Sequence, residues 1–260
     1  MKGHLSLKKI IFIGLLSFLL AALWQLPLSF AKPYAEKMVA GLKLTGVSGT
    51  VWNGTARNLT INDNNLGHVD WKVKPLQSLT SLSLKSTFNL SGEQISANGI
   101  AAVTPSKKLI INNTTFDVDA SYLNAYQKHA KLTGDIKGTI NHTELDLDSK
   151  EKKLPILDAI IDWKQATVSS LLLNLSAGDY HIVITPDSEG LLITPSSKEA
   201  PLEINGKINL SNDWLLQPNI KLKSNDQRIS GMLKLAGKTQ ADGSTLINSK
   251  TNLKPFLKIK

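Results

Sequence analysis

Alternation of apolar and polar residues with a period of two is the main pattern of this chain after about residue 44. In residues 132–140, Leu132, Ile136 and Ile140 fall on one face of a strand, because successive strand side chains point to opposite sides. The same alternation recurs farther along, at residues 204–210 and 229–235. Such runs, separated by turns rich in Asn, Asp and Gly, predict a mainly β fold: an antiparallel sheet that is curled or folded over its apolar face.

Several local elements follow from the same kind of pattern. Residues 221–223 and 232–235 are expected to pair as a hairpin around Asn225, since Ser, Asn and Asp between them favour a turn. Short helices are expected in four stretches where the apolar residues do not alternate with polar ones. These stretches are Ala35–Leu44, Pro75–Leu79, Ser121–His129 and Leu154–Ile160.

The amino-terminal segment is continuously apolar. Lysines at positions 2, 8 and 9 precede an uncharged run that extends from Ile10 to Ala31. A helix over residues 10–30 would measure about 30 Å, the thickness of the hydrocarbon core of a bilayer. Lysines before such a run favour a cytoplasmic amino terminus. The pattern predicts a transmembrane anchor with the rest of the chain on the far side of the membrane.

A cleaved secretory signal is the alternative interpretation of this segment. Ser29 and Ala31 have the small-x-small spacing of a cleavage site, and residues 10–23 have the length of a signal's apolar region. Phe30 and Pro27 disfavour cleavage after Ala31. Both interpretations predict that the domain is exported.

Two parts of the chain resemble each other. Residues 44–52 align with residues 132–140, and Val69–Lys72 aligns with Ile161–Lys164 in the same order. This predicts an internal duplication. The expected organisation is a cytoplasmic terminus (1–9), an anchor (10–30), a juxtamembrane segment (31–43) and a β domain (44–260). Within the β domain we expect modules at about 44–125 and 132–213, followed by terminal strands at 214–260.

Composition narrows the possible functions. The 260 residues include no cysteine, which excludes disulfides, thiolate metal sites and cysteine nucleophiles. The net charge is 30 − 21 = +9, but three lysines precede Ile10, so residues 32–260 carry 27 − 21 = +6. Aromatic residues make up only 6% of the chain, too few for a base-stacking surface. We therefore expect no nucleic-acid partner.

No residue pattern points to catalysis. Glu144, Asp146 and Asp148 alternate along one face, but the glycine turn and carbonyl-rich loop of a calcium site are missing, so a solvated acidic face is the preferred interpretation. The histidines lack zinc-ligand spacing; they are His4, His68, His129, His142 and His181. Nucleophile-elbow, phosphate-loop and dinucleotide-binding motifs are absent. We expect no enzyme activity, no cofactor, and no catalytic, cofactor-binding or metal-binding residues.

Tryptophan motifs are the most distinctive local features. Asp70-Trp71-Lys72 and Asp162-Trp163-Lys164 each place an indole between two charges. The simpler interpretation is that the indoles pack against the sheet while the charges face water. The alternative is that they belong to a docking edge or an apolar groove.

The motifs together resemble a known family. The order of the words LTGVSGTVWNG (44–54), GHVDWK (67–72) and LSGEQISANG (90–99) resembles protein N of the bacterial type II secretion system. The resemblance implies a single-pass inner-membrane protein with a periplasmic β domain, which assists export of folded proteins across the outer membrane together with other secretion subunits. The glycine-punctuated strands are also similar to AsmA-type β-groove proteins, which implies a carrier of lipid or another hydrophobic molecule, or a factor in outer-membrane biogenesis.

Two hypotheses therefore remain open. In the first, exposed strand edges and turns contact other secretion subunits. In the second, an apolar trough shields acyl chains of a lipid. The trough would be lined by Leu132, Ile136, Ile140, Ile204, Ile208 and Leu210. The two hypotheses differ in whether that face is closed by packing or left open.

Overall fold

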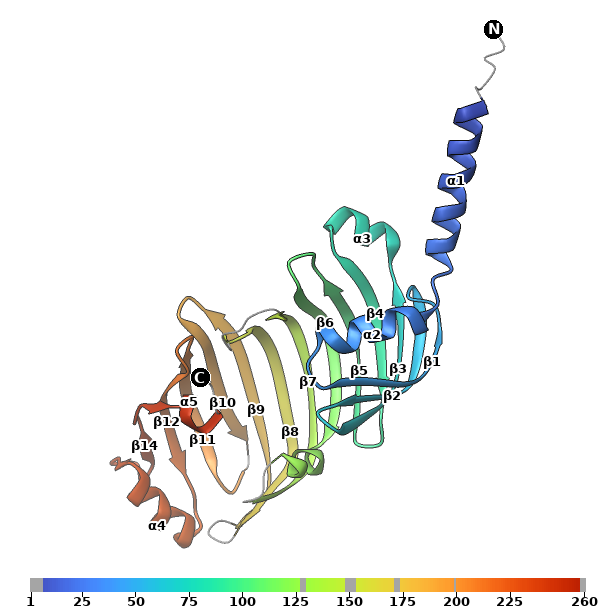
Figure 1. Cartoon of the computed structure of the whole chain (residues 1–260). Coiled ribbons are helices and arrows are strands. Elements are labelled where there is room, and N and C mark those ends of the chain that lie inside the picture. The colour runs from blue at the N-terminus through green and yellow to red at the C-terminus, as the bar shows by residue number, and fades with distance from the viewer. Residues whose placement is uncertain (1–6, 127–129, 148–152, 171–173, 199, 258–260) are drawn as a thin grey trace.

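One open antiparallel sheet makes up most of the molecule (Figure 1). The computed structural model describes residues 7–126, 130–147, 153–170, 174–198 and 200–257. The strands are β1 (Leu42–Gly49), β2 (Asn53–Ile61), β3 (Asn64–Val73), β4 (Leu84–Ser91), β5 (Ile95–Val103), β6 (Lys108–Asp119), β7 (Ala130–Asp146), β8 (Ile156–Ser170), β9 (Asn174–Asp187), β10 (Gly190–Lys198), β11 (Glu203–Ser211), β12 (Leu215–Lys223), β13 (Lys238–Thr239), β14 (Thr245–Ile247) and β15 (Thr251–Asn252).

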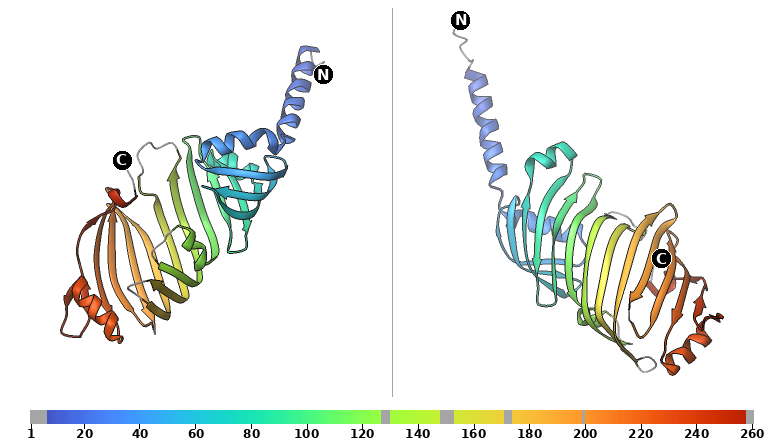
Figure 2. Two further views of the ribbon diagram at one scale, coloured as in Figure 1. Left: turned by 60° about the horizontal axis from the view of Figure 1, so that its bottom comes forward. Right: turned by 180° about the vertical axis from the view of Figure 1, so that it is seen from behind.

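From β1 to β12 each strand pairs with the next one along the chain. Strand β12 also pairs with β14 and with β15, and β14 pairs with β13. This meander confirms the expected mainly β, antiparallel fold. The strands expected at residues 132–140 and 204–210 are present within β7 and β11. Figure 2 shows that the sheet is a single layer that twists along its length and curls most strongly at β1–β3.

Helices occur at the ends of the sheet and in its turns. They are α1 (Leu7–Trp24), α2 (Leu28–Met38), α3 (Pro75–Ser81), the 3₁₀ helix η1 (Ala120–Ala125), α4 (Gln227–Ala236) and α5 (Lys254–Leu257). The helix expected at Pro75–Leu79 is confirmed as α3, which begins with proline at its first position, where a missing N–H is harmless.

Other expected helices need correction. The helix expected at Leu154–Ile160 is wrong, because Ile156 begins β8 and pairs with Glu144 of β7. Ala35–Leu44 is divided: α2 ends at Met38, and β1 begins at Leu42. For Ser121–His129, the structure has only the 3₁₀ helix η1, and residues 127–129 lie outside the described part of the chain.

The expected hairpin around Asn225 is also wrong. Residues 227–236 form α4 instead of a strand. The Asp226 carboxylate accepts hydrogen bonds from the amides of Arg228 (2.8 Å) and Ile229 (3.3 Å), which caps the helix. These amides lower the pKa of Asp226. Ile229, Leu233 and Ala236 recur at helical spacing, so this apolar pattern fits a helix as well as a strand, and the cap favours the helix.

The apolar amino-terminal segment is not one helix over residues 10–30. Helix α1 ends at Trp24, and α2 begins at Leu28 after an extended Pro27 (φ −64°, ψ 144°) that bridges to Thr50 of the sheet. A proline disfavours helical geometry in the residue before it, which explains the break. Within the described residues, no helix combines the length and the apolar character that crossing a membrane requires.

A cluster of buried apolar side chains lies at the amino-terminal end of the sheet. Leu44, Ala56, Val69 and Leu90 form a buried cluster, and Trp71 packs against it. Helix α2 contacts β1, and its first residue, Leu28, is buried. No large side chain of the described residues is completely buried, as expected for a sheet that is one layer thick.

Candidate functional site

The register of the strands joins apolar residues into a continuous row across ten strands. Each residue of the row stands directly opposite the next, and opposite residues of an antiparallel pair lie on the same face. From β1 to β10 the row consists of Val47, Ala56, Val69, Leu90, Ala97, Phe116, Gly138, Ile161, Ile182 and Pro195. We call the side of the sheet that carries this row the apolar face.

Parallel rows extend the apolar face along the strands. One row runs from β6 to β12 through Thr114, Ile140, Ala159, Ile184, Ile193, Ile208 and Pro218. Another runs from β5 to β9 through Ile95, Val118, Ile136, Trp163 and Tyr180. None of the residues in the three rows carries a charge. The face is therefore apolar along and across the strands.

Beyond β5 most large side chains of the apolar face are only partly covered, although Thr114, Ala159 and Leu191 are buried. Phe116, Ile161, Ile182, Ile193 and Ile208 are each only half-buried. The residues expected to line a trough share this face and this exposure: Leu132, Ile136, Ile140, Ile204, Ile208 and Leu210 are all half-buried. The prediction that they lie on one face is confirmed, and packing does not close that face.

The edge strands of the sheet are less accessible to a binding partner than the apolar face is. At the β1 edge, the Glu36 carboxylate of α2 accepts a hydrogen bond from the Leu44 amide (2.8 Å), and the Leu42 amide donates to the Val39 carbonyl (3.1 Å). At the other end, β12 pairs with two short strands, β14 and β15. Covering edges in this way protects a sheet from strand addition. At Leu42 and Leu44 of β1 the edge is therefore covered, and the use of other edges as contact sites stays a hypothesis.

Both tryptophans of the distinctive motifs lie on the apolar face. The Trp71 indole donates to the Val51 carbonyl (3.0 Å), and the Trp163 indole donates to the Thr133 carbonyl (3.1 Å). Trp71 packs into the buried cluster, as the simpler interpretation predicts. Trp163 instead belongs to the open part, where its ring lies 6.2 Å from that of Tyr180. Burial raises the pKa of the Tyr180 hydroxyl, so the residue stays neutral there.

The strands that carry Trp71 and Trp163 have different neighbours in the sheet, which bears on the predicted internal duplication. Trp163 lies on β8, which pairs directly with β7 and its residues 132–140. Trp71 lies on β3, which is separated from β1 and its residues 44–49 by β2. The internal duplication and its module boundaries stay predictions.

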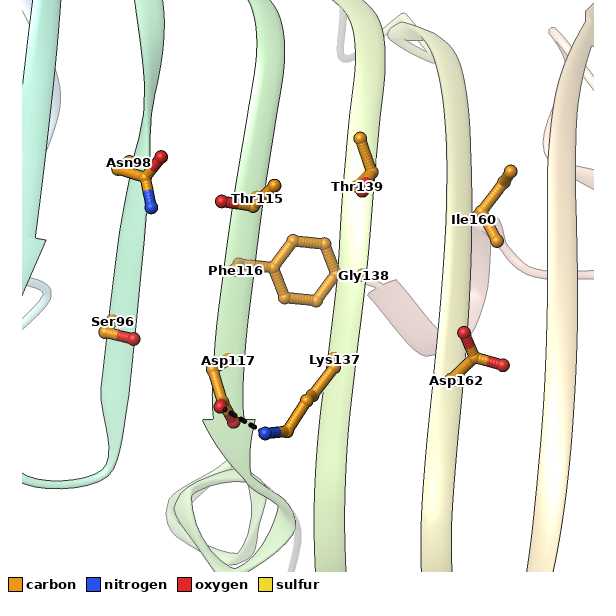
Figure 3. A pocket seen from close by; sticks show the side chains of 10 residues that line it. All are labelled: Ser96, Asn98, Thr115, Phe116, Asp117, Lys137, Gly138, Thr139, Ile160 and Asp162. Carbon is orange, nitrogen blue, oxygen red and sulfur yellow. Dashed lines mark ion pairs between the residues drawn. The ribbon is translucent and has the colours of Figure 1, made fainter.

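The opposite face of the sheet is mainly polar and carries a shallow hollow of about 460 Å³ (Figure 3). One row across it joins Asp117, Lys137, Asp162 and His181. Lys137 Nζ lies 2.9 Å from Asp117 Oδ2, and His181 Nδ1 lies 2.8 Å from Asp162 Oδ1. Because Lys137 pairs with Asp117 and the His181 ring lies within hydrogen-bond distance of Asp162, the side chains of this row contact one another across the strands and support their register.

The acidic residues and histidines that the structure describes do not gather into a metal-binding group. Glu144 pairs with Lys108 (3.2 Å) and lies 3.6 Å from His142, while Asp146 lies two residues along the same strand. Asp148, His4 and His129 lie outside the described residues. Within the described ranges, no group of three or more potential ligands could hold a metal ion.

Sequence reasoning missed part of the apolar face. It named β7 and β11 residues, whereas the register adds Phe116, Ile161 and Ile182 between and beside them. The available signal was the β-branched and aromatic content of these segments. Pairing between strands decides which residues join one row. Gly138, for example, stands opposite Phe116, and a Cβ at position 138 would lie 2.5 Å from Cζ of that ring.

Comparison with known proteins places this fold in a family. The family model "Type II secretion system (T2SS), protein N" matches residues 40–248, which covers the sheet from just before β1 to β14. Comparisons with curated proteins and with solved structures found no match. The match covers most of the chain and agrees with the resemblance carried by residues 44–54, 67–72 and 90–99. The chain therefore belongs to the type II secretion system protein N family, a component of the secretion machinery.

Proposed function

We propose that this protein is a non-enzymatic inner-membrane component of the type II secretion system, which assists export of folded proteins from the periplasm across the outer membrane. It acts by presenting the apolar face of its sheet to other secretion subunits. The observation that carries this proposal is the uncharged row that crosses β1–β10 and is only half-buried from β5 to β10. Large contiguous apolar surfaces on soluble domains mark interaction sites.

Contact through the face fits the geometry better than strand addition. Strand addition needs a row of unpaired amides and carbonyls at a sheet edge. At the β1 edge, Glu36 of α2 accepts from the Leu44 amide, and the Val39 carbonyl just after α2 accepts from the Leu42 amide. The apolar face, in contrast, offers half-buried side chains such as Ile161 and Ile182, whose further burial would contribute roughly 25 cal/mol per Å² of apolar area.

The proposed location is the inner membrane, with the amino terminus in the cytoplasm and the sheet in the periplasm. Lys8 and Lys9 precede the apolar residues of α1 in the sequence, and positive residues favour the cytoplasmic side. Phe12 and Phe18 are exposed on α1, which projects away from the sheet (Figure 1). Aqueous exposure of such a helix is unfavourable, and a bilayer would bury it.

A reporter fusion tests this topology. An enzyme that is active only outside the cytoplasm, fused after residue 260, is expected to be active in cells, because the proposed topology puts the carboxyl terminus in the periplasm. A matched fusion placed before Lys2 is expected to be inactive. An inactive carboxyl-terminal fusion of normal abundance would contradict the periplasmic location.

A pair of neighbouring isoleucines tests the proposed surface. Ile160 and Ile161 are consecutive in β8 and lie on opposite faces of the sheet. A photo-crosslinking amino acid at position 161 is expected to capture secretion subunits in intact cells, because this side chain lies in the middle of the apolar row. The same amino acid at position 160, on the polar face, is the control. Mass spectrometry of the products identifies the partners.

The result that would contradict the proposal is equal capture from both positions, or no secretion subunit among the products from position 161. Probe incorporation and full-chain abundance must match between the two variants. Deletion of the gene is expected to reduce release of secreted proteins, and unchanged release would also count against a role in the machinery.

A second candidate function is transport or shielding of acyl chains by the same face. The specific observation in its favour is that the apolar rows continue without a charged residue across β5–β9, as a path for a hydrocarbon chain requires. The crosslinking experiment separates the two candidates. A phospholipid attached at position 161, in the absence of protein partners, would support a carrier of the AsmA-like kind, whereas a secretion subunit would support the first proposal.

A further inference from the structure

One end of the strands gathers exposed apolar side chains next to α1. Leu76 and Leu82, at the start and just past the end of α3, are 81% and 78% exposed, and Leu84 at the start of β4 is 44% exposed. Side chains of this size are rarely left so exposed without a partner when they lie together. Helix α3 connects β3 to β4 and projects beyond the end of the sheet (Figure 1).

Hydrogen bonds place the end of α1 at this same end of the sheet. Trp24 is the last residue of α1, and its ring stacks on that of Trp52 with ring centroids 5.9 Å apart. Trp52 Nε1 donates a hydrogen bond to the Leu23 carbonyl (2.8 Å). The Val73 amide then donates to the Trp52 carbonyl (2.7 Å), directly before α3 begins. A chain of short contacts therefore holds the last residues of α1 near the strand end from which α3 begins.

Charge distinguishes this region from the turns near the carboxyl terminus at the same end of the strands. Between Trp71 and Gly92 the sequence has three lysines, at positions 72, 74 and 85, and no acidic residue. The turns at the same end of the strands near the carboxyl terminus are acidic instead, with exposed Asp187, Glu189 and Asp213. Anionic lipid headgroups attract lysine and repel carboxylates.

We propose that α3 and its flanking residues form a second membrane contact, in which Leu76 and Leu82 enter the surface of an anionic phospholipid bilayer beside α1. This inference rests on the proposed attachment to the inner membrane and deepens it. The stacked Trp24 and Trp52 lie at the level where indoles favour the interface between lipid and water. Two contacts fix the tilt of the sheet relative to the membrane, which a single helix followed by a break at Pro27 would not do alone.

The absence of cysteine allows a direct test on the full chain. Single variants Leu76→Cys, Leu16→Cys and Leu235→Cys are labelled with an environment-sensitive fluorophore and reconstituted into vesicles of phosphatidylethanolamine and phosphatidylglycerol. Leu16 lies on α1. Leu235 lies on α4, is 91% exposed, and follows β12 at the opposite end of the strands, so it is the matched control. Brominated lipid is then added as a quencher that acts only on contact.

The expected result is a several-fold rise in emission at position 76 that brominated lipid quenches, quenching at position 16, and no quenching at position 235. Replacing lysines 72, 74 and 85 together by glutamine is expected to reduce the signal at position 76 in these vesicles. In vesicles of phosphatidylcholine alone the same replacement is expected to have little effect, because no anionic headgroup is present.

Quenching at position 16 without quenching at position 76 would overturn the α3 contact and leave attachment through α1 intact. Quenching at neither position would overturn both. Equal quenching at positions 76 and 235 would show adsorption without orientation, which also overturns the inference. A rise in emission at position 76 without quenching would indicate a protein neighbour and would overturn it as well.

Discussion

Replacing Ile161 by aspartate is expected to reduce release of type II secreted proteins at least tenfold (about 1.4 kcal/mol or more of lost partner binding). Replacing the neighbouring Ile160 by aspartate is expected to leave release nearly unchanged. The two residues are identical in type and consecutive in β8, but Ile161 belongs to the apolar row and Ile160 lies on the polar face.

The physical reason is the cost of covering a charge. A carboxylate at position 161 is hydrated in the free protein, since the side chain is only half-buried. Once a partner or an acyl chain covers the face, this carboxylate loses water and finds no cation among Gly138 and Ile182, its cross-strand neighbours. The desolvation penalty then opposes binding.

The measurement is the fraction of a secreted enzyme found in the culture medium, with chain abundance and protease resistance of both variants compared with the wild type. Because Ile161 is partly exposed in the free protein, the sheet is expected to fold with either aspartate. Equal secretion by both variants at normal abundance would remove the apolar face from the mechanism. The variant Ile161→Ala is the control in case the aspartate variant is less abundant, because it shortens the side chain without adding a charge. Its effect on release is expected to lie between those of the wild type and the aspartate variant.

Replacing Leu90 by alanine is expected to destabilise the folded chain by about 2–4 kcal/mol, whereas Leu84→Ala should cost about 1 kcal/mol or less. Both leucines lie on β4 and on the same face of the sheet, so the substitutions are chemically and topologically matched. Leu90 is 8% exposed within the cluster that includes Leu44 and Val69, and Leu84 is 44% exposed. Deleting a buried side chain loses its burial energy and leaves a cavity.

Urea unfolding followed by tryptophan fluorescence measures this difference, since Trp71 packs against the cluster. With a denaturant slope of roughly 3 kcal/mol/M, the Leu90 variant is expected to unfold at about 1 M lower urea than the wild type. Equal midpoints for the two variants would mean that the amino-terminal cluster does not provide the main tertiary packing of the sheet.

These two predictions reflect two different parts of one sheet. Near β1–β4 the curl of the strands buries the apolar face, and that part is expected to dominate stability. From β5 onward the same face is open, and that part is expected to dominate binding. A single-layer sheet cannot bury both faces, so this division follows from the architecture itself.

Strand periodicity was a reliable guide wherever one face is apolar along its whole length. Residues 132–140 and 204–210 alternate strictly, and both are strands. The pattern failed at residues 229–235, where alternate positions also satisfy helical spacing and the Asp226 cap selects α4. The helix expected at Leu154–Ile160 was wrong for another reason: the pairing of β8 with β7 outweighs a local helical pattern.

By itself the sequence determined the β class, the apolar character of one strand face, the absence of cysteine chemistry and the family. These properties depend on residue types and local spacing, which a sequence contains in full. Only the tertiary structure decided that α1 ends at Trp24, that α2 covers the β1 edge, and that Phe116, Ile161 and Ile182 join one row. Each of these depends on which backbone groups pair across the sheet, and a shift of one residue in register would place the same side chains on the opposite face.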